Sequence, residues 1–385
     1  MLFTGLKRCW KIYPVQGNSR HHGLNSLRTN SLFPDSINIR LLLDLKLTLS
    51  CKLAFCDEAG PRFTDTKGHY MDSLQELLID GIRYDPRYLP SGNADHMPMT
   101  LCAISGLGGH QDALLAYRDQ YKKILHEIPS VRASPDWRQG IGRNESYPSL
   151  LAWFTEQVAA KGIESAVSEY LPEFIGSLAM EAFHPIIRLG YAIDFKSEAE
   201  TAAALAYIAS SHKNVPVRID HTIDLRTGLL EQVKTGPRSF KGTGFTLSVC
   251  ELLDENNYPS GRAADISNAA IVALDIFRST RNFFALHMVT ATQAVRICSE
   301  YIDKKLALAA LTGGLLAAHQ VVGSPDFDRD HSMPVNDRLS DEHTYKYAWA
   351  CLSEYRHYGD NRYLEEIRAF RQSGLIPQWC AANEV

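Results

Sequence analysis

The sequence predicts an all-α or mostly α protein whose folded part is a single large helical domain. Apolar residues recur at spacings of three and four along most of the chain, which is typical of amphipathic helices. Alternating apolar and polar residues are scarce, and the only weak strand candidates are residues 214–225 and 244–253. Breaks rich in proline and glycine fall near residues 85–93, 129–148, 235–244 and 323–336.

The helical segments follow one another from Met71 onward, where "MDSLQELLIDGIRYDPRY" opens like a helix of a folded domain. Further helical periodicity covers residues 149–183, 197–211, 264–280, 289–322 and 342–372. A length of roughly 300 residues suits one large domain. We therefore expect a helical domain over residues 71–375 and a short C-terminal tail over residues 376–385.

Residues 1–70 differ from the rest of the chain. Residues 1–34 contain lysines and arginines but no acidic residue. The apolar stretch at residues 41–56 is interrupted by Asp44, Lys46 and Lys52, so it is a poor membrane span. We expect a poorly structured, dispensable extension upstream of a later natural start at Met71; a transit peptide is the alternative.

Composition restricts the class of protein. Of the 385 residues, 45% are hydrophobic and 22% are charged, which is ordinary for a globular protein with a sizeable core. A net charge of -4 gives no reason to expect a nucleic acid or an anionic membrane as partner. The eight cysteines are scattered without a C-x-x-C pair, which favours free thiols and a cytoplasmic protein. No feature predicts the oligomeric state.

Common catalytic and cofactor motifs are missing. "GLGGHQ" at residues 106–111 resembles part of a dinucleotide fingerprint, but no strand precedes it and Gln111 replaces the last glycine. The sequence has no P-loop and no G-x-S-x-G elbow. Glu181–His184 is the one E-x-x-H pair that fits, whereas a di-iron bundle needs two. The sequence thus leaves an NADPH requirement open, since it carries no nicotinamide or flavin fingerprint.

Four histidines lie in unusually apolar stretches: His96, His184, His287 and His343. A single histidine on an apolar face is usually a hydrogen-bonded core residue. A set of four raises the prospect of a metal site, because neutral imidazole is the commonest ligand for iron, zinc and copper. Lys346 follows His343 by three residues and shares its helix face. A lysine ammonium repels a metal, so Lys346 is either a surface residue or chemically converted.

Five blocks of the sequence resemble the successive motifs of the questin oxidase-like family, in the manner of a bacterial-type member. The resemblance runs from about Met71 to about residue 370. The blocks are "DHMPMTLCAISGLGG", "AFHPIIRLGYAID", "HMVTATQAVR", "LTGGLLAAHQ" and "SDEHTYKYAWAC".

The resemblance implies a helical oxygenase of aromatic polyketides, with a small aromatic substrate and O2 as its partners. Fungal relatives oxidise or open anthraquinone-type rings, some of them by Baeyer–Villiger-type chemistry. The family's site is a mononuclear iron held by four histidines and a carboxylated lysine. By motif position these ligands are His96, His184, His287, His343 and Lys346, with His110 and His319 as alternatives for the first.

The same residues suggest roles at the site. A lysine that loses its proton beside a metal can add carbon dioxide and become an anionic carbamate ligand. Histidine ligands need acceptors for their other ring nitrogen, and the candidates are Asp95, Glu181, Asp341 and Glu342. Arg188 and Glu342 are the expected catalytic residues; a buried ion pair for Arg188 and a helix N-terminal charge for Glu342 are the alternatives. The candidate pocket-lining residues are Phe283, Phe284, Tyr191 and Met288, which could equally be plain core.

Three functions remain open on the residues. The first is a non-haem iron(II) oxygenase that oxidises or cleaves a polycyclic aromatic or quinone-type substrate. The second is a zinc-dependent hydrolase that uses the same histidines to activate water. The third is a non-catalytic helical binding module whose histidines are only packed. Metal content separates the three.

Overall fold

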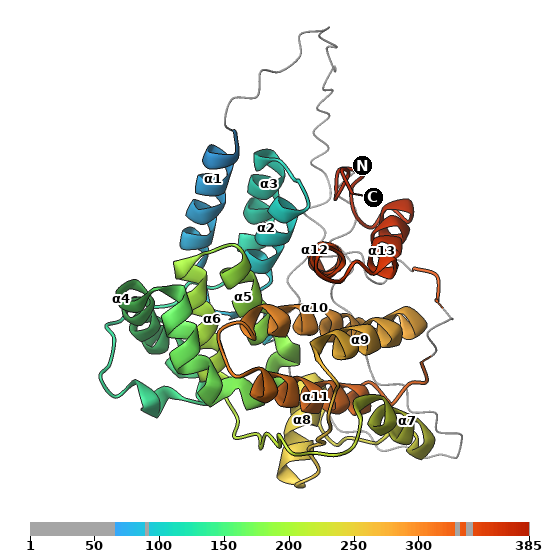
Figure 1. Cartoon of the computed structure of the whole chain (residues 1–385). Helices are drawn as coiled ribbons and strands as arrows, with labels where there is room; N and C mark the ends of the chain where they lie inside the picture. Colours follow the sequence, from blue (N-terminus) through green and yellow to red (C-terminus); the bar gives the residue numbers. More distant parts are fainter. Residues whose placement is uncertain (1–65, 89–91, 328–331, 336–341, 385) are drawn as a thin grey trace, which may run out of the picture. The chain divides into compact units, whose positions relative to one another are not determined.

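The computed structural model describes residues 66–88, 92–327, 332–335 and 342–384 (Figure 1). Thirteen α-helices, five short 3₁₀ helices and one short antiparallel strand pair make up the regular structure of these residues. The first helices and strands are α1 Thr66–Gly81, β1 Arg87–Tyr88, β2 Asn93–Ala94, α2 Met97–Gly106, α3 Gln111–Tyr121 and α4 Tyr147–Phe174. The next are α5 His184–Asp194, α6 Glu198–Ser210, α7 Leu225–Thr235, α8 Phe245–Asp254 and α9 Ile266–Thr280. The last are α10 Phe283–Cys298, α11 Lys304–Val321, α12 Glu342–Tyr358 and α13 Asn361–Gln372.

These helices confirm the predicted helical fold, and the described residues from Lys67 onward lie in one compact unit. The first helix begins at Thr66, five residues before the expected domain start at Met71. The rest of the expected N-terminal extension lies outside the described residues. The expected C-terminal tail packs on the domain, since the Ala381 backbone N–H donates to the Leu107 carbonyl over 2.9 Å.

Both strand candidates are wrong. Residues 244–253 form most of α8, in which Phe245, Val249 and Leu252 recur at helical spacing and are buried. Residues 214–225 contain only an isolated parallel bridge between Asp224 and Arg262. A short apolar run is compatible with a helix or a strand. Here the helix is the form that buries Phe245, Val249 and Leu252 on one face.

Two predicted helical stretches each contain two helices, because capping residues divide them. Residues 289–322 divide before Asp303, whose carboxylate accepts the backbone N–H of Leu306 at 2.8 Å and starts α11. Residues 342–372 divide before Asp360, which caps α13 in the same way. An aspartate cap satisfies backbone donors that the first helical turn leaves unpaired.

The helices α5 and α10 form the centre of the packing. Helix α5 packs on α2, α6 and α10, and α10 also packs on α9, α11 and α12. Gly190 permits the close approach of α5 and α10, because a Cβ atom there would lie 2.6 Å from Cβ and 2.7 Å from Cα of Ala294. Among the helices of the described residues, none combines the length and apolar character that a membrane crossing requires.

We expect Gly190→Ala to destabilise the protein by about 1–3 kcal/mol, because the added methyl meets the backbone of α10. Thermal unfolding of the full chain measures the change. Gly228→Ala in α7 is the matched control: its methyl meets only side-chain ends of Leu316 and Ile223, at 3.1 Å and 3.6 Å. The control should be neutral or stabilising by up to about 1 kcal/mol, since alanine favours helix. Equal effects of the two substitutions would contradict the close-packing argument.

Candidate metal centre

The structure brings His96, His184, His287 and His343 together. One potential ligand atom from each lies within 4.8 Å of the others, and all four residues are buried. His96 precedes α2 as its N-cap, His184 is the first residue of α5, and His343 is the second residue of α12. His287 lies in the first half of α10. Three helix starts and one helix face therefore converge on one point.

Hydrogen bonds fix the proton positions on two of the rings. His184 Nδ1 contacts the Glu181 carbonyl oxygen, and His287 Nδ1 lies 3.0 Å from the Phe283 carbonyl oxygen. A carbonyl only accepts, so each Nδ1 carries a proton and each neutral ring has its lone pair on Nε2. These two Nε2 atoms lie 3.2 Å apart. Two lone pairs at this distance repel unless a cation lies between them.

His96 adds a third nitrogen to the same point. Its Nδ1 lies 2.9 Å from Glu342 Oε1, and its Nε2 lies 2.7 Å from His184 Nε2. The one ring proton of neutral His96 can lie on Nδ1, facing this carboxylate, or on Nε2, facing His184. An ionised carboxylate is a stronger acceptor than a neutral imidazole nitrogen, so the proton lies on Nδ1 and the Nε2 lone pair of His96 faces the centre. The arrangement is a ligand histidine with a carboxylate behind it. The residues present thus fit a metal ion.

Burial and neighbouring cations keep the histidines neutral. Desolvation lowers the pKa of His96, His184 and His287 well below its ordinary value. For His96 and His184 the second cause of the lowered pKa is the charge of Lys346, whose side chain is buried. Lys346 therefore lies in the same electrostatic environment as the histidines. Its conversion to a carbamate stays a prediction.

A left-handed turn positions His184. Glu181, Ala182 and Phe183 have φ angles of 52°, 52° and 67°, although none of them is glycine. Left-handed backbone costs about 1–2 kcal/mol per residue, and consecutive cases are uncommon. Such strain concentrates at functional sites. Here the turn directs the Glu181 carbonyl oxygen at His184 Nδ1, and Pro185 then starts α5.

Glu181 is also held through its side chain. Its carboxylate lies 3.6 Å from Arg87 Nε, and both side chains are mostly shielded from solvent. We expected the Glu181 carboxylate as an acceptor for a histidine, but its backbone carbonyl has that contact. Asp95 uses Oδ1 to accept the backbone N–H of Met97 at 2.8 Å, at the start of α2. Asp341 lies outside the described residues.

Arg188 makes the buried ion pair that we considered as the alternative. Its Nε and Nη2 donate to the carboxylate of Glu200 over 2.7 Å and 3.0 Å. A catalytic role for Arg188 stays a prediction. The alternative ligands lie outside the cluster: His319 contacts Gln232 Oε1 at 2.7 Å, and His110 is exposed before α3.

The expected pocket-lining residues divide into two groups. The Phe283 ring lies 4.6 Å from the His343 ring and 5.1 Å from the His287 ring, and the Phe284 ring lies 6.2 Å from the His287 ring. Tyr191 is buried and donates its hydroxyl hydrogen to the Lys346 carbonyl, whereas Met288 is buried in the core. Of the four expected residues, Phe283 and Phe284 therefore have rings next to the histidines.

Tyr121 is a site residue that we did not predict. Its hydroxyl oxygen accepts the His96 backbone N–H over 3.1 Å and lies 3.2 Å from His96 Nδ1. It is the last residue of α3 and is buried. A tyrosine on an amphipathic helix has the sequence signature of ordinary core, and only the fold brings it to His96.

The fold and the site define a helical protein with a buried histidine centre. Residues 94–274 match the family model described as Questin oxidase-like, which confirms the resemblance seen in the motifs. Over these residues the chain is therefore similar to the questin oxidase-like proteins. The matched region contains His96 and His184 and ends before His287 and His343.

Curated relatives agree with this family. A questin oxidase of Aspergillus terreus is 30% identical over 138 residues, which are 31% of this chain and 30% of the relative. A Baeyer-Villiger monooxygenase of Cryptosporiopsis sp. is 28% identical over 181 residues, which are 41% of this chain and 40% of the relative. A Baeyer-Villiger oxidase of Pestalotiopsis fici is 27% identical, over 43% of this chain and 38% of the relative. The similarity thus spans well under half of each of these relatives.

We expect Ala182→Gly to leave stability unchanged or to raise it by up to about 1 kcal/mol, since glycine adopts a positive φ without strain. Ala203→Gly is the matched control, because Ala203 is buried within the regular helix α6. The control should lose about 1 kcal/mol or more. Chemical denaturation of the full chain measures both, and equal losses would argue against the left-handed turn.

Proposed function

We propose that the protein is a non-haem iron-dependent oxygenase that oxidises or cleaves a polycyclic aromatic or quinone-type substrate of polyketide metabolism. The buried four-histidine cluster is the observation that carries the proposal. Relatives named questin oxidase and Baeyer-Villiger monooxygenase support an oxidoreductase. Because the aligned segments cover 30% and 40% of these two relatives, their activities come to this chain as part of the proposal.

Iron would be held by His96, His184, His287 and His343, with Lys346 as a carbamate supplying an anionic oxygen. Neutral imidazole suits iron, zinc and copper alike. Zinc sites in proteins usually have three or four ligands, so a fifth donor favours iron. When bound, iron(II) would supply the redox chemistry that makes dioxygen reactive toward an electron-rich ring.

The chain's own residues prepare the centre for this metal. Glu342 holds the proton at His96 Nδ1, and the Glu181 and Phe283 carbonyls hold the protons at Nδ1 of the other two rings. Each ring then presents a lone pair without rearrangement when the metal binds. Low exposure of the four rings keeps bulk water away from the centre.

The electrons for the reaction come either from the substrate or from a separate donor such as NADPH. Absorbance and fluorescence titrations of the full chain with NADPH test the second route directly. Saturable binding would identify NADPH as a co-substrate, and no binding would favour a reaction in which the substrate supplies the electrons.

We expect about one iron per chain in protein produced with iron and zinc available, by elemental mass spectrometry. Because a ligand of the native state stabilises it, stripping the metal should lower the stability by about 4 kcal/mol where the metal is present at 1,000 times its dissociation constant. His343→Ala should lose the metal. His319→Ala is the control, since it removes a buried histidine outside the cluster.

One zinc per chain would contradict the oxygenase and support a hydrolase. No metal under any loading condition would contradict the metal centre and leave a packed histidine cluster. Equal metal loss in the two histidine variants would indicate general unfolding in place of ligand removal.

We expect Glu342→Gln to weaken metal binding about 10-fold or more, because the amide is a poorer acceptor for the His96 Nδ1 proton. Competition with a chelator of known affinity measures the change. Glu354→Gln is the matched control on the same helix: Glu354 is buried and pairs with Arg296 at 2.7 Å. Its metal affinity should be unchanged, and a similar loss in both variants would oppose a role of Glu342 at the site.

A further inference from the structure

The four histidines have almost no contact with solvent. Their exposed fractions are 4% for His96, 7% for His184, 0% for His287 and 3% for His343. If the proposed function holds, a metal ion, dioxygen and a flat substrate must nevertheless reach the centre. Access therefore requires that some neighbouring group moves.

Most of the described groups around the centre are packed in the interior. On α2 and α5, the neighbours Met97, Pro185 and Ile186 are buried. On the side of α3, Tyr121 is buried as well. In contrast, Phe283 and Phe284 are only partly buried, at the first turn of α10. Of the described aromatic residues whose rings contact the histidines, these two reach solvent.

Phe283 touches two of the four rings. It meets the rings of His343 and His287 edge to face at 4.6 Å and 5.1 Å, whereas Phe284 reaches only His287 at 6.2 Å. The Phe283 ring thus contacts half of the cluster and is itself partly exposed to solvent. The Phe284 ring lies 5.4 Å from the Phe283 ring, and the buried Phe245 ring packs on Phe284 at 5.1 Å.

The backbone beneath Phe283 is held, while its ring can turn. Asn282 caps α10 by accepting the backbone N–H groups of Phe284 and Ala285 at 2.8 Å and 3.3 Å. The Phe283 carbonyl oxygen is engaged by His287 Nδ1. A rotation about its two side-chain torsions would move the ring away from His343 and His287, and partly exposed side chains change rotamer quickly.

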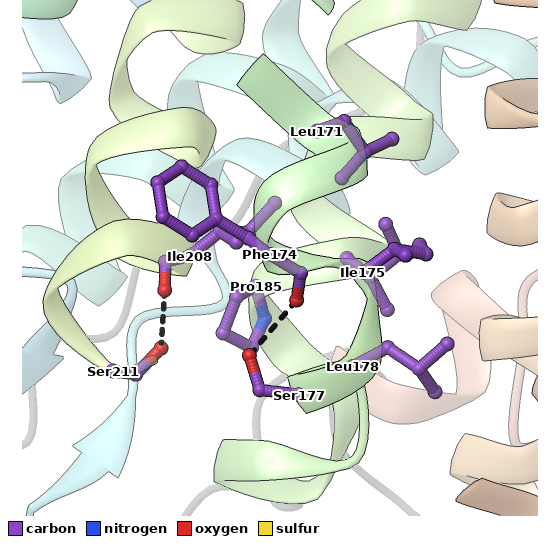
Figure 2. Close-up of a pocket in the computed structure, with 9 residues that line it drawn as sticks. Leu171, Phe174, Ile175, Ser177, Leu178, Pro185, Ile208 and Ser211 are labelled. Atoms are coloured by element: carbon purple, nitrogen blue, oxygen red, sulfur yellow. Dashed lines mark hydrogen bonds between the residues drawn. The ribbon is translucent and has the colours of Figure 1, made fainter. Parts of the chain in front are cut away.

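A second approach to the centre is less suitable. The pocket in Figure 2 has an empty volume of about 230 Å³, open solvent included, and Pro185, the residue after His184, is one of the residues that line it. Its wall includes Leu178, Phe174 and Ser177, whose hydroxyl donates to the Phe174 carbonyl. Passage from this pocket would require displacement of the first turn of α5, and therefore of the His184 backbone.

We propose that Phe283 is the gate of the histidine centre and the surface on which a flat aromatic molecule stacks as it enters. This inference rests on the proposed function. Edge-to-face and offset contacts between aromatic rings are favourable by about 0.5–1.5 kcal/mol beyond burial. A planar aromatic molecule can replace the contacts that Phe283 makes with His343 and His287, whereas a polar molecule of similar size cannot. Phe283 therefore selects for aromatic ligands.

The test is the rate at which 2,2′-bipyridine, a flat aromatic chelator, removes iron from the loaded full chain. Phe283→Ala should accelerate removal about tenfold, and Phe283→Trp should slow it. Metal affinity at equilibrium should stay within a factor of two to three for both, because Phe283 contributes its backbone to His287 and that backbone remains. Phe283→Leu provides a second small variant should the alanine variant fold poorly.

Two matched controls locate the route. Phe284→Ala removes the neighbouring partly exposed ring, and Leu178→Ala widens the pocket of Figure 2; neither should change the rate of iron removal much. Acceleration by Leu178→Ala without acceleration by Phe283→Ala would overturn the proposal in favour of the pocket. Equal rates for all variants would also overturn it, because access would then depend on a larger opening.

The gate can be tested separately from the metal. Diethyl pyrocarbonate modifies accessible neutral histidines, and peptide mass spectrometry assigns each modified residue. In metal-free protein, Phe283→Ala should raise the modification rate of His287 and His343 about tenfold and leave His319 unchanged. If the protein binds no iron but this pattern appears, the gate stands and the iron centre fails. If iron binds but neither rate responds to Phe283, the gate fails alone.

Discussion

The arrangement of this protein depends on one constraint: three Nε2 lone pairs face one another in a space without bulk water. His184 Nε2 lies 2.7 Å from His96 Nε2 and 3.2 Å from His287 Nε2. Each ring is held in this tautomer by an acceptor at Nδ1. In the low dielectric of the interior, such a cluster is favourable only with a cation that all of the lone pairs can share. This part of the interior therefore presents electron-pair donors to a cation, as a metal-binding site does.

The fold holds the histidine rings in this arrangement at a cost in local stability. Three successive left-handed residues, from Glu181 to Phe183, place a carbonyl where His184 needs it. The contact between Gly190 and Ala294 brings α5 close enough to α10 for His184 to meet His287. Both devices lie on α5 or directly before it. This helix is consequently the element on which the geometry of the centre depends most.

Much of the fold can be predicted from the local periodicity of apolar residues, and the histidine centre can be predicted from sequence motifs. Helical periodicity predicts most of the helices, because one face of each is buried; it fails at residues 244–253, where a short apolar run suits either structure. The four histidines could be predicted because each of them lies in a recognisable sequence motif. Tyr121 and the pairing of Arg188 with Glu200 could not, since they depend on contacts between segments distant in sequence. The backbone carbonyl of Glu181 has no signature in the sequence, because any residue supplies a carbonyl.

The charge at Lys346 would have to change sign when a metal binds. As an ammonium, Lys346 opposes protonation of His96 and His184, and it would equally oppose a divalent cation. A carbamate at the same nitrogen replaces one positive charge by one negative charge in a buried environment, where a change of sign has its largest effect. The burial that makes the ammonium unfavourable also favours the neutral amine, which is the form that reacts with carbon dioxide. Loss of carbon dioxide would then weaken metal binding, although every histidine stayed in position.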